Sequence, residues 1–215
     1  MSASKPRVGA LILAGGTSSR MGRDKLALQR GGITLLDTVV QGAVDALHAI
    51  STGPPVVVVG PVVVIGEASN PESWPGVSWT REQPPGGGPV AAIAAGLDHL
   101  GHVYEPSTTH ADTAVVILAG DAPAGPEAIP LLYERLCDGD ADGVVLVDGD
   151  GRRQPLCAIY REDVLREALA SFGETHGTSL HALLEHLRLV EVIDNRRLAA
   201  DIDTLVDAHR FGFYA

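Results

Sequence analysis

Apolar runs alternate with segments of helical spacing along most of this chain. Short apolar stretches, many of them rich in β-branched residues, predict strands at 8–14, 56–59, 77–81, 114–119, 143–147, 156–160 and 189–193. Segments with apolar residues three or four apart predict helices at 35–49, 90–100, 126–136, 162–171, 179–187 and 204–211. Alternation of this kind is typical of βαβ units. The pattern therefore predicts an α/β fold around a mostly parallel, Rossmann-like sheet.

The pattern is clear for one predicted strand and leaves alternatives for another. The stretch 114–119 is apolar throughout, so we expect it to be a central strand. The stretch 61–65 begins with Pro61, which cannot donate a hydrogen bond to a neighbouring strand. It could continue the second strand past a kink or form a separate edge piece. Segments 67–75, 83–89 and 101–112 are expected to be loops, the second a proline- and glycine-rich turn.

Composition is that of a folded protein. The chain has 215 residues, of which 45% are hydrophobic and 20% charged, so we expect one domain over 1–215 with a substantial core. Aromatic residues make up only 4%, which favours an aliphatic core like that of a buried parallel sheet. The net charge of −11 argues against nucleic acid or an anionic membrane as partner, but it permits a small anionic ligand held by local cations.

Cellular location is inferred from what the pattern lacks. Residues 1–7 carry no apolar segment typical of a signal peptide. The apolar stretch 56–65 is far short of the roughly 20 residues that cross a bilayer. Cys137 and Cys157 do not form a CxxC pair, so neither a disulfide framework nor a zinc site is indicated. We therefore expect a cytoplasmic protein.

The loop after the first predicted strand is the strongest candidate for a binding site. Residues 15–25 hold three glycines and the cations Arg20, Arg23 and Lys25. Glycines let a backbone approach a ligand closely, and exposed N–H groups with flexible cations suit an oligophosphate. Neither the P-loop nor the dinucleotide-binding pattern fits, because Gly15 and Gly16 are adjacent. An ordinary βα turn with solvated charges is the alternative.

Two further candidates also follow predicted strands. Asp121 comes directly after the central strand, at the edge where open α/β sheets bind ligands, and a carboxylate there suits Mg²⁺. Its alternative role is a helix cap or a turn. Gly88-Pro89 precedes the helix at 90–100, whose first N–H groups would face an anion or a polar base.

The opening loop also resembles a known family. Residues Leu13 to Lys25 match the pattern Leu-Ala-Gly-Gly-x-x-x-Arg-Met-Gly-x-Asp-Lys of the nucleotidyltransferases typified by molybdenum cofactor guanylyltransferases. Later segments are similar to that family in the same order. They are Gly88-Pro89-Val90-Ala91-Ala92-Ile93, Asp121-Ala122-Pro123, the run from Gln154-Pro155-Leu156 to Tyr160, and Asp201-Ile202-Asp203-Thr204.

The resemblance implies a three-layer nucleotidyltransferase fold and a Mg²⁺-dependent reaction. GMP would pass from GTP to the phosphate of Mo-molybdopterin with release of pyrophosphate, and no general base is required if that phosphate is a dianion. Arg20, Lys25 and Asp121 would be catalytic, with Arg23 as a helper. Metal ligands would be Asp121, Asp201 and Asp203. Nucleotide-binding residues would be Leu13, Ala14, Gly15, Gly16, Lys25, Glu82, Gly88, Pro89 and Asp121.

Departures from the family pattern leave the substrates open. Leu205 stands where the family has a proline, Gly60-Pro61 where it often has an asparagine, and Glu82 matches its acidic residue only with a gap. A cytidylyltransferase, an enzyme for another phosphorylated acceptor, or a non-catalytic nucleotide-binding relative are the alternatives. Asp201 or Asp203 could instead cap the helix at 204–211, and His176 and His181 are expected to be structural or surface residues. Transient contact with proteins that deliver or receive the molybdenum cofactor is expected.

Overall fold

A computed structural model describes residues 5–14, 24–51, 59–65, 74, 77–103, 113–185 and 187–214. Its main sheet runs, from edge to edge, through β5 (Val77–Thr80), β4 (Val59–Ile65), β1 (Arg7–Leu13), β6 (Thr113–Ala119), β8 (Arg153–Arg161), β7 (Gly143–Val147) and β9 (Leu189–Ile193). Strand β8 is antiparallel to both its neighbours, β6 and β7. The other neighbouring strands pair in parallel. The predicted α/β fold with a mostly parallel sheet is confirmed.

The strands β1 and β6 form the centre of this sheet. They pair in unbroken parallel register from Arg7 opposite Thr113 to Leu13 opposite Ala119. Both are buried along almost their whole length, as an apolar run without alternation predicts. Their carboxyl ends therefore lie side by side, which places Leu13 and Ala14 next to Gly120 and Asp121.

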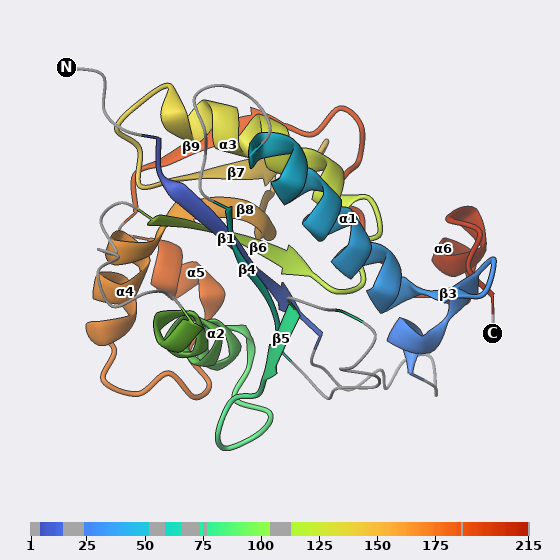
Figure 1. Cartoon of the computed structure of the whole chain (residues 1–215), viewed down its shortest axis with the longest axis horizontal. Coiled ribbons are helices and arrows are strands. Elements are labelled where there is room, and N and C mark those ends of the chain that lie inside the picture. Colours follow the sequence, from blue (N-terminus) through green and yellow to red (C-terminus); the bar gives the residue numbers. More distant parts are fainter. Residues whose placement is uncertain are drawn as a thin grey trace.

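Helices cover both faces of the sheet and make the three layers visible in Figure 1. On one face, α1 (Leu35–Ser51) and α3 (Ile129–Cys137) pack on apolar side chains of β1 and β6 such as Ile12 and Val116. On the other face, α2 (Pro89–Val103), α4 (Glu162–Ala170) and α5 (Leu180–Leu184) pack on Leu11 and Ile117. Alternate residues of one strand thus enter opposite cores.

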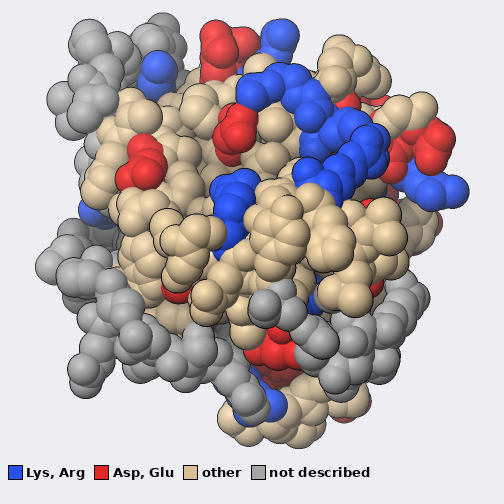
Figure 2. Space-filling model, turned by 90° about the vertical axis from the view of Figure 1, so that its right-hand side faces the viewer, with Lys and Arg blue, Asp and Glu red and all other residues tan. Residues whose placement is uncertain are grey.

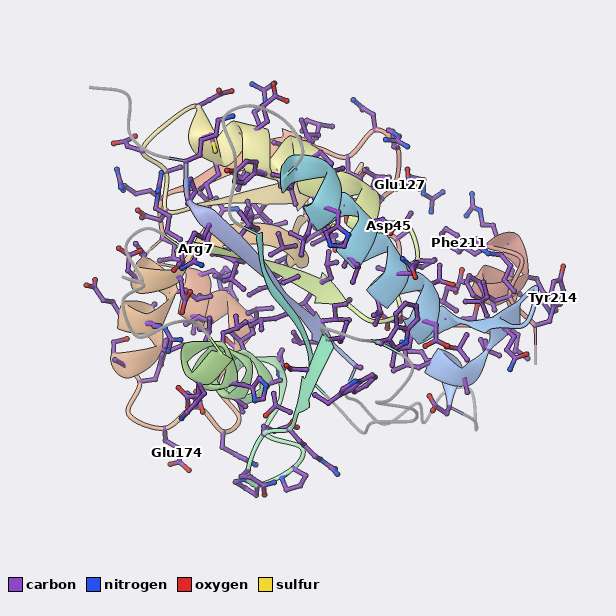
Figure 3. The ribbon with its side chains drawn as sticks, viewed as in Figure 1. Arg7, Asp45, Glu127, Glu174, Phe211 and Tyr214 are labelled. Atoms are coloured by element: carbon purple, nitrogen blue, oxygen red, sulfur yellow. The ribbon has the colours of Figure 1, made fainter. Side chains whose placement is uncertain are left out.

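A small unit beside the main sheet was not predicted. The hairpin β2 (Gln29–Arg30) and β3 (Ile33–Thr34) is too short and polar to give a clear pattern. The last helix, α6 (Leu205–Arg210), returns to it, and Gln29 and Tyr214 exchange backbone hydrogen bonds of 2.8 Å. Phe211 and Tyr214 lie at this end of the molecule in Figure 3. Leu28, Leu35, Ile202, Ala208 and Phe213 form a core of their own there.

Strand β4 settles the two alternatives for Pro61. The strand is continuous through Pro61, but its register with β1 jumps from Val8 opposite Val59 to Ala10 opposite Val62. The extra residue is accommodated by a bulge at Gly60-Pro61, and pairing with β5 begins only at Val62. A proline is tolerated there because a bulge needs no ladder donor. Residues 56–58 of the predicted strand lie outside the described residues.

Other predicted boundaries shift for local reasons. Helix α2 continues to Val103, so the start of the predicted loop 101–112 is helical, and 104–112 lies outside the described residues. The predicted helix 126–136 is a 3₁₀ turn, Gly125–Ala128, followed by α3. Of the predicted loop 67–75, only Trp74 is described. In the part of the chain that the structure describes, no helix is both long and apolar enough to cross a membrane.

Candidate active site

Gly120 allows the ends of the two central strands to approach closely. Its N–H donates a 2.9 Å hydrogen bond to the carbonyl of Leu13. A Cβ at Gly120 would lie 3.1 Å from that carbonyl oxygen and 3.3 Å from Cα of Ala14. A side chain would therefore push the strand ends apart. Leu13 and Ala14, expected to face the nucleotide, are thus held directly beside Asp121.

The segment 201–203 lies against Asp121, next to the carboxyl end of β6. The N–H of Ile202 donates a 3.0 Å hydrogen bond to the carbonyl of Asp121, and the Ile202 side chain is fully buried in the small core. Asp201 and Asp203 flank Ile202, and their carboxylates meet that of Asp121. One oxygen from each of these three groups lies within 4.8 Å of the others. The structure thus brings together all three residues expected to bind a metal.

Helix α6 does not use either aspartate as its cap. Thr204 is the capping residue: its hydroxyl accepts a 3.2 Å hydrogen bond from the N–H of Asp207, and its own N–H donates to the Asp207 carboxylate at 2.9 Å. This reciprocal pair is a capping box. The alternative role of Asp201 or Asp203 as the cap is therefore wrong.

Lys25 places a positive charge among these carboxylates. It begins a short 3₁₀ turn, Lys25–Ala27, whose start is capped by the Asp24 side chain, 2.9 Å from the N–H of Leu26. Its ammonium forms an ion pair with Asp121 and lies 3.2 Å from Oδ1 of Asp203. Burial by itself lowers the pKa of Lys25, but hydrogen bonds and charge from Asp121 and Asp203 outweigh it and raise that pKa.

The cluster has the donor set and the electrostatics of a site for a hard cation. The pKa of Asp201 is raised, first by loss of solvation and then by the negative charges of Asp203 and Asp121. Carboxylates that repel one another in this way are stabilised by a divalent ion between them. Oxygen ligands are those that Mg²⁺ prefers. Asp121, Asp201 and Asp203 therefore fit a magnesium ion, with Lys25 as the internal counter-charge.

Four of the predicted phosphate- and nucleotide-binding residues, Gly15, Gly16, Arg20 and Arg23, lie outside the described residues. Their neighbours on both sides, Ala14 and Asp24, are described, and Lys25 next to Asp24 reaches the carboxylates. Ala14 before these residues and Lys25 after them thus both lie close to Asp121.

The proline- and glycine-rich turn lies at the carboxyl end of β5, which β4 and β1 separate from β6 in the sheet. Oε1 of Glu82 accepts a 3.0 Å hydrogen bond from the N–H of Gly86, so this carboxylate closes the turn. Gly88 has φ +86°, a conformation that favours glycine, and its carbonyl accepts the N–H of Ala92 at 3.0 Å. Pro89 then starts α2, in the position that proline favours.

The turn is supported by the loop that contains His176. The N–H of Gly177 donates a 3.0 Å hydrogen bond to the carbonyl of Gly87. A Cβ at Gly87 would lie 3.2 Å from Cδ2 of His176 and 2.6 Å from Cβ of Ala91. His176 thus contacts the turn although it is exposed, and His181 is exposed on α5, so both positions agree with the structural or surface roles expected of them.

A pocket of about 180 Å³ opens beside the carboxylates. Its walls are Ala119 at the end of β6, residues 154–157 at the start of β8, Leu180, Ala199 and Asp201. Because β8 is antiparallel, its first residues share the edge where β6 ends. Gln154 to Cys157 belong to the segment that resembled the family, so the sequence indicated one wall of this pocket but not Leu180 or Ala199.

Asp194 supports the site and was missed by the sequence reasoning. Its buried carboxylate accepts hydrogen bonds of 2.9 Å from the N–H groups of Leu198 and Ala199. These bonds shape the segment that leads from β9 to Asp201. An aspartate directly after a predicted strand is a signal for such a side-chain-to-backbone turn, and it could have been found.

The surface charge on the face that Figure 2 shows differs from the charge of the whole chain. Figure 2 shows this face, where Lys and Arg atoms gather in a band although the net charge is −11. A local basic surface of this kind is compatible with anionic substrates.

Comparisons with known proteins agree with this geometry. The family described as "MobA-like NTP transferase domain" matches residues 10–192. A "Probable molybdenum cofactor guanylyltransferase" from Mycobacterium tuberculosis H37Rv is 31% identical over 191 residues, which cover 87% of this chain and 85% of the relative.

Two solved structures share the fold at lower identity. Molybdopterin-guanine dinucleotide biosynthesis protein A from Archaeoglobus fulgidus has a TM-score of 0.62 at 21% identity, over 94% of this chain and 95% of that one. A 2-C-methyl-D-erythritol 4-phosphate cytidylyltransferase from Francisella tularensis has a TM-score of 0.69 at 14% identity, over 95% and 98%. These two likenesses concern the fold alone.

Proposed function

Because the chain belongs to the family of MobA-like NTP transferase domains, we propose that it transfers GMP from GTP to the phosphate of Mo-molybdopterin, releasing pyrophosphate. Family membership makes the chain a nucleotidyltransferase. The guanylyl group and the pterin acceptor are supported by the name of the relatives that are 31% identical. The observation that carries the proposal is the cluster of Asp121, Asp201 and Asp203 around Lys25 at the carboxyl edge of the sheet.

Phosphoryl and nucleotidyl transfer depend on charge neutralisation and alignment more than on a protein nucleophile. Asp121, with Asp201 and Asp203, would hold Mg²⁺, which supplies neutralisation of the phosphate charge when it is bound. Lys25 would move its hydrogen bonds from these carboxylates to the triphosphate. Arg20, with help from Arg23, would hold the same phosphates.

The opening loop and the proline- and glycine-rich turn would bind the two ends of the nucleotide. Backbone groups of residues 13–16 would contact the phosphates and the sugar, since Gly120 holds Leu13 and Ala14 beside Asp121. Glu82, Gly88 and Pro89 would contact the base from the turn before α2. The acceptor would enter from the other side, through the pocket between Asp201 and Gln154. Its phosphate would attack the α-phosphorus in line with the departing pyrophosphate, and as a dianion it needs no general base.

A cytidylyltransferase is the second candidate. The chain shares its fold with the Francisella tularensis cytidylyltransferase. Because one fold can serve enzymes for different bases, CTP is the competing substrate to test. Proteins that deliver or receive the molybdenum cofactor are proposed as transient partners of the guanylyltransferase.

The test is pyrophosphate release by the purified full chain with Mo-molybdopterin, Mg²⁺ and each of GTP, CTP, ATP and UTP. We expect turnover with GTP, and a loss of about 100-fold or more in Asp121→Asn. The matched control is Asp45→Asn, an exposed carboxylate on α1 that is not part of the cluster and accepts a hydrogen bond from Gln41; Figure 3 labels it. Faster turnover with CTP would overturn the guanylyl assignment. Unchanged turnover in Asp121→Asn would overturn the metal assignment.

A further inference from the structure

The turn between β7 and β8 is organised by one carboxylate. Oδ1 of Asp148 accepts hydrogen bonds of 2.9 Å from the N–H groups of both Asp150 and Arg152. The N–H of Arg152, foremost, lowers the pKa of Asp148, so this side chain is ionised at neutral pH and can only accept hydrogen bonds. Its second oxygen, Oδ2, is left to face the start of β8.

That second oxygen holds the side chain of Gln154. Nε2 of Gln154 donates a 2.7 Å hydrogen bond to Oδ2 of Asp148 and lies 3.5 Å from the carbonyl oxygen of Arg152. Both partners are acceptors, so the amide must turn its NH₂ group toward them. The carbonyl oxygen Oε1 is then the group that Gln154 presents on its other side.

Gln154 is a wall of the pocket beside the carboxylate cluster, together with Asp201. Gln154 and Asp201 are the side chains with oxygen acceptors in this lining, while Ala119, Leu156 and Leu180 are apolar. A lining of this kind suits a flat molecule with apolar faces and N–H groups along its edge.

We propose that Asp148 is a positioning residue, which fixes the Gln154 amide so that its carbonyl oxygen selects a heterocyclic acceptor with N–H donors. The lactam N–H and the amino group of a pterin ring are such donors. The proposal rests on the proposed function for the choice of a pterin as acceptor. It adds the atom that recognises the ring and the residue that orients that atom.

The variant Asp148→Asn tests the orientation itself. The substituted side chain has one oxygen, which the two N–H groups of the turn require, so its NH₂ group faces Gln154. The Gln154 amide then turns over and presents Nε2 to the pocket, where it repels N–H donors.

The probes are 6-hydroxymethylpterin and its N3-methyl analogue, which lacks the lactam N–H, with binding to the full chain measured by calorimetry. The wild type should bind the pterin about five- to tenfold more tightly than the analogue, the effect of one hydrogen bond. This preference should disappear in Asp148→Asn and in Gln154→Leu. Adding Asp148→Asn to Gln154→Leu should change nothing further, because Asp148 acts through Gln154.

Asp150→Asn is the control, because Asp150 is exposed in the same turn and contributes its backbone N–H to the network. It should keep the wild-type preference. A residue that merely stabilised the turn would lower the melting temperature and weaken both probes equally, with or without Gln154. That result, an unchanged preference in Asp148→Asn, or failure of the wild type to bind or distinguish the probes would overturn the inference.

The proposed function can fail in the same experiments while the inference about Asp148 holds. Absence of GMP transfer by a wild type that still prefers the pterin probe would overturn the guanylyltransferase assignment and leave the role of Asp148 standing.

Discussion

The ammonium of Lys25 lies 3.2 Å from the carboxylate of Asp203, although the two residues are at opposite ends of the chain. The same ammonium pairs with Asp121, so one cation offsets the repulsion within a group of three carboxylates. One ammonium among three carboxylates leaves the cluster short of positive charge, so a bound divalent cation would take over part of the role of Lys25.

Lys25→Met should destabilise the metal-free protein by about 1 kcal/mol, because the carboxylates lose their counter-charge. Added Mg²⁺ should raise the melting temperature of this variant more than that of the wild type, while GTP binding becomes weaker. Thermal unfolding with and without Mg²⁺, followed by a GTP titration, measures both effects. Lys5→Met removes an exposed lysine as the control. Equal Mg²⁺ responses in wild type and Lys25→Met would contradict this role of Lys25.

Asp194→Ala should weaken metal binding although Asp194 is not one of the proposed metal ligands. Loss of the two hydrogen bonds to Leu198 and Ala199 frees the segment that places Asp201, and the buried N–H of Leu198 and the half-buried N–H of Ala199 lose their partner. We expect a fall of about 1–3 kcal/mol in the free energy of unfolding and weaker Mn²⁺ binding. Chemical denaturation gives the first and electron paramagnetic resonance of Mn²⁺ the second. Wild-type Mn²⁺ affinity in the variant would argue against this support.

Gly87→Ala should disturb the turn that is proposed to contact the base. The new methyl group would lie 2.6 Å from Cβ of Ala91, too close without a shift of backbone. We expect about 1–3 kcal/mol lower stability and weaker nucleotide binding, measured by thermal unfolding in the presence and absence of GTP. Gly139→Ala is the matched control, since a Cβ there meets nothing within 4 Å. Identical GTP responses in the two variants would refute a role of this turn in binding.

Asp142, which binds Arg188 at the β9 edge of the sheet, should make the free energy of unfolding depend on pH. Its carboxylate accepts hydrogen bonds of 2.8 Å from both the N–H and the guanidinium of Arg188. Burial opposes ionisation, but these contacts with Arg188 outweigh it and lower the pKa of Asp142. A carboxyl whose pKa is lower in the folded state stabilises the fold above its unfolded pKa, near 3.9, and loses that effect as pH falls through the folded pKa.

Asp142→Asn should therefore lower the free energy of unfolding by about 1 kcal/mol at pH 7, and this difference should shrink below about pH 4. Urea denaturation at a series of pH values measures it. Asp138→Asn, in the exposed loop before β7, serves as the control. A difference that stays constant down to pH 2 would show that the charge of Asp142 is not what stabilises the fold.

The amino-acid sequence by itself determined the order of the main-sheet strands and the helices that cover them, because apolar runs and helical spacing are local properties of the chain. It also identified the opening loop, Asp121 and the Gly88-Pro89 turn as candidates, since each follows a strand and the ends of parallel strands share one edge. The sequence did not predict the hairpin at 29–34 or the bulge at Pro61. Short polar strand pairs and strand register depend on contacts with residues that are distant in the chain.

The tertiary structure decided which candidates meet. Burial of Ile202 and its hydrogen bond to the carbonyl of Asp121 turn Asp201 and Asp203 toward Asp121, where sequence reasoning had left a helix cap as the alternative. The return of the C-terminal segment to the hairpin at Gln29 then brings Asp203 within reach of Lys25. A site of this kind depends on contacts between distant parts of the chain, and packing rather than local pattern brings those parts together.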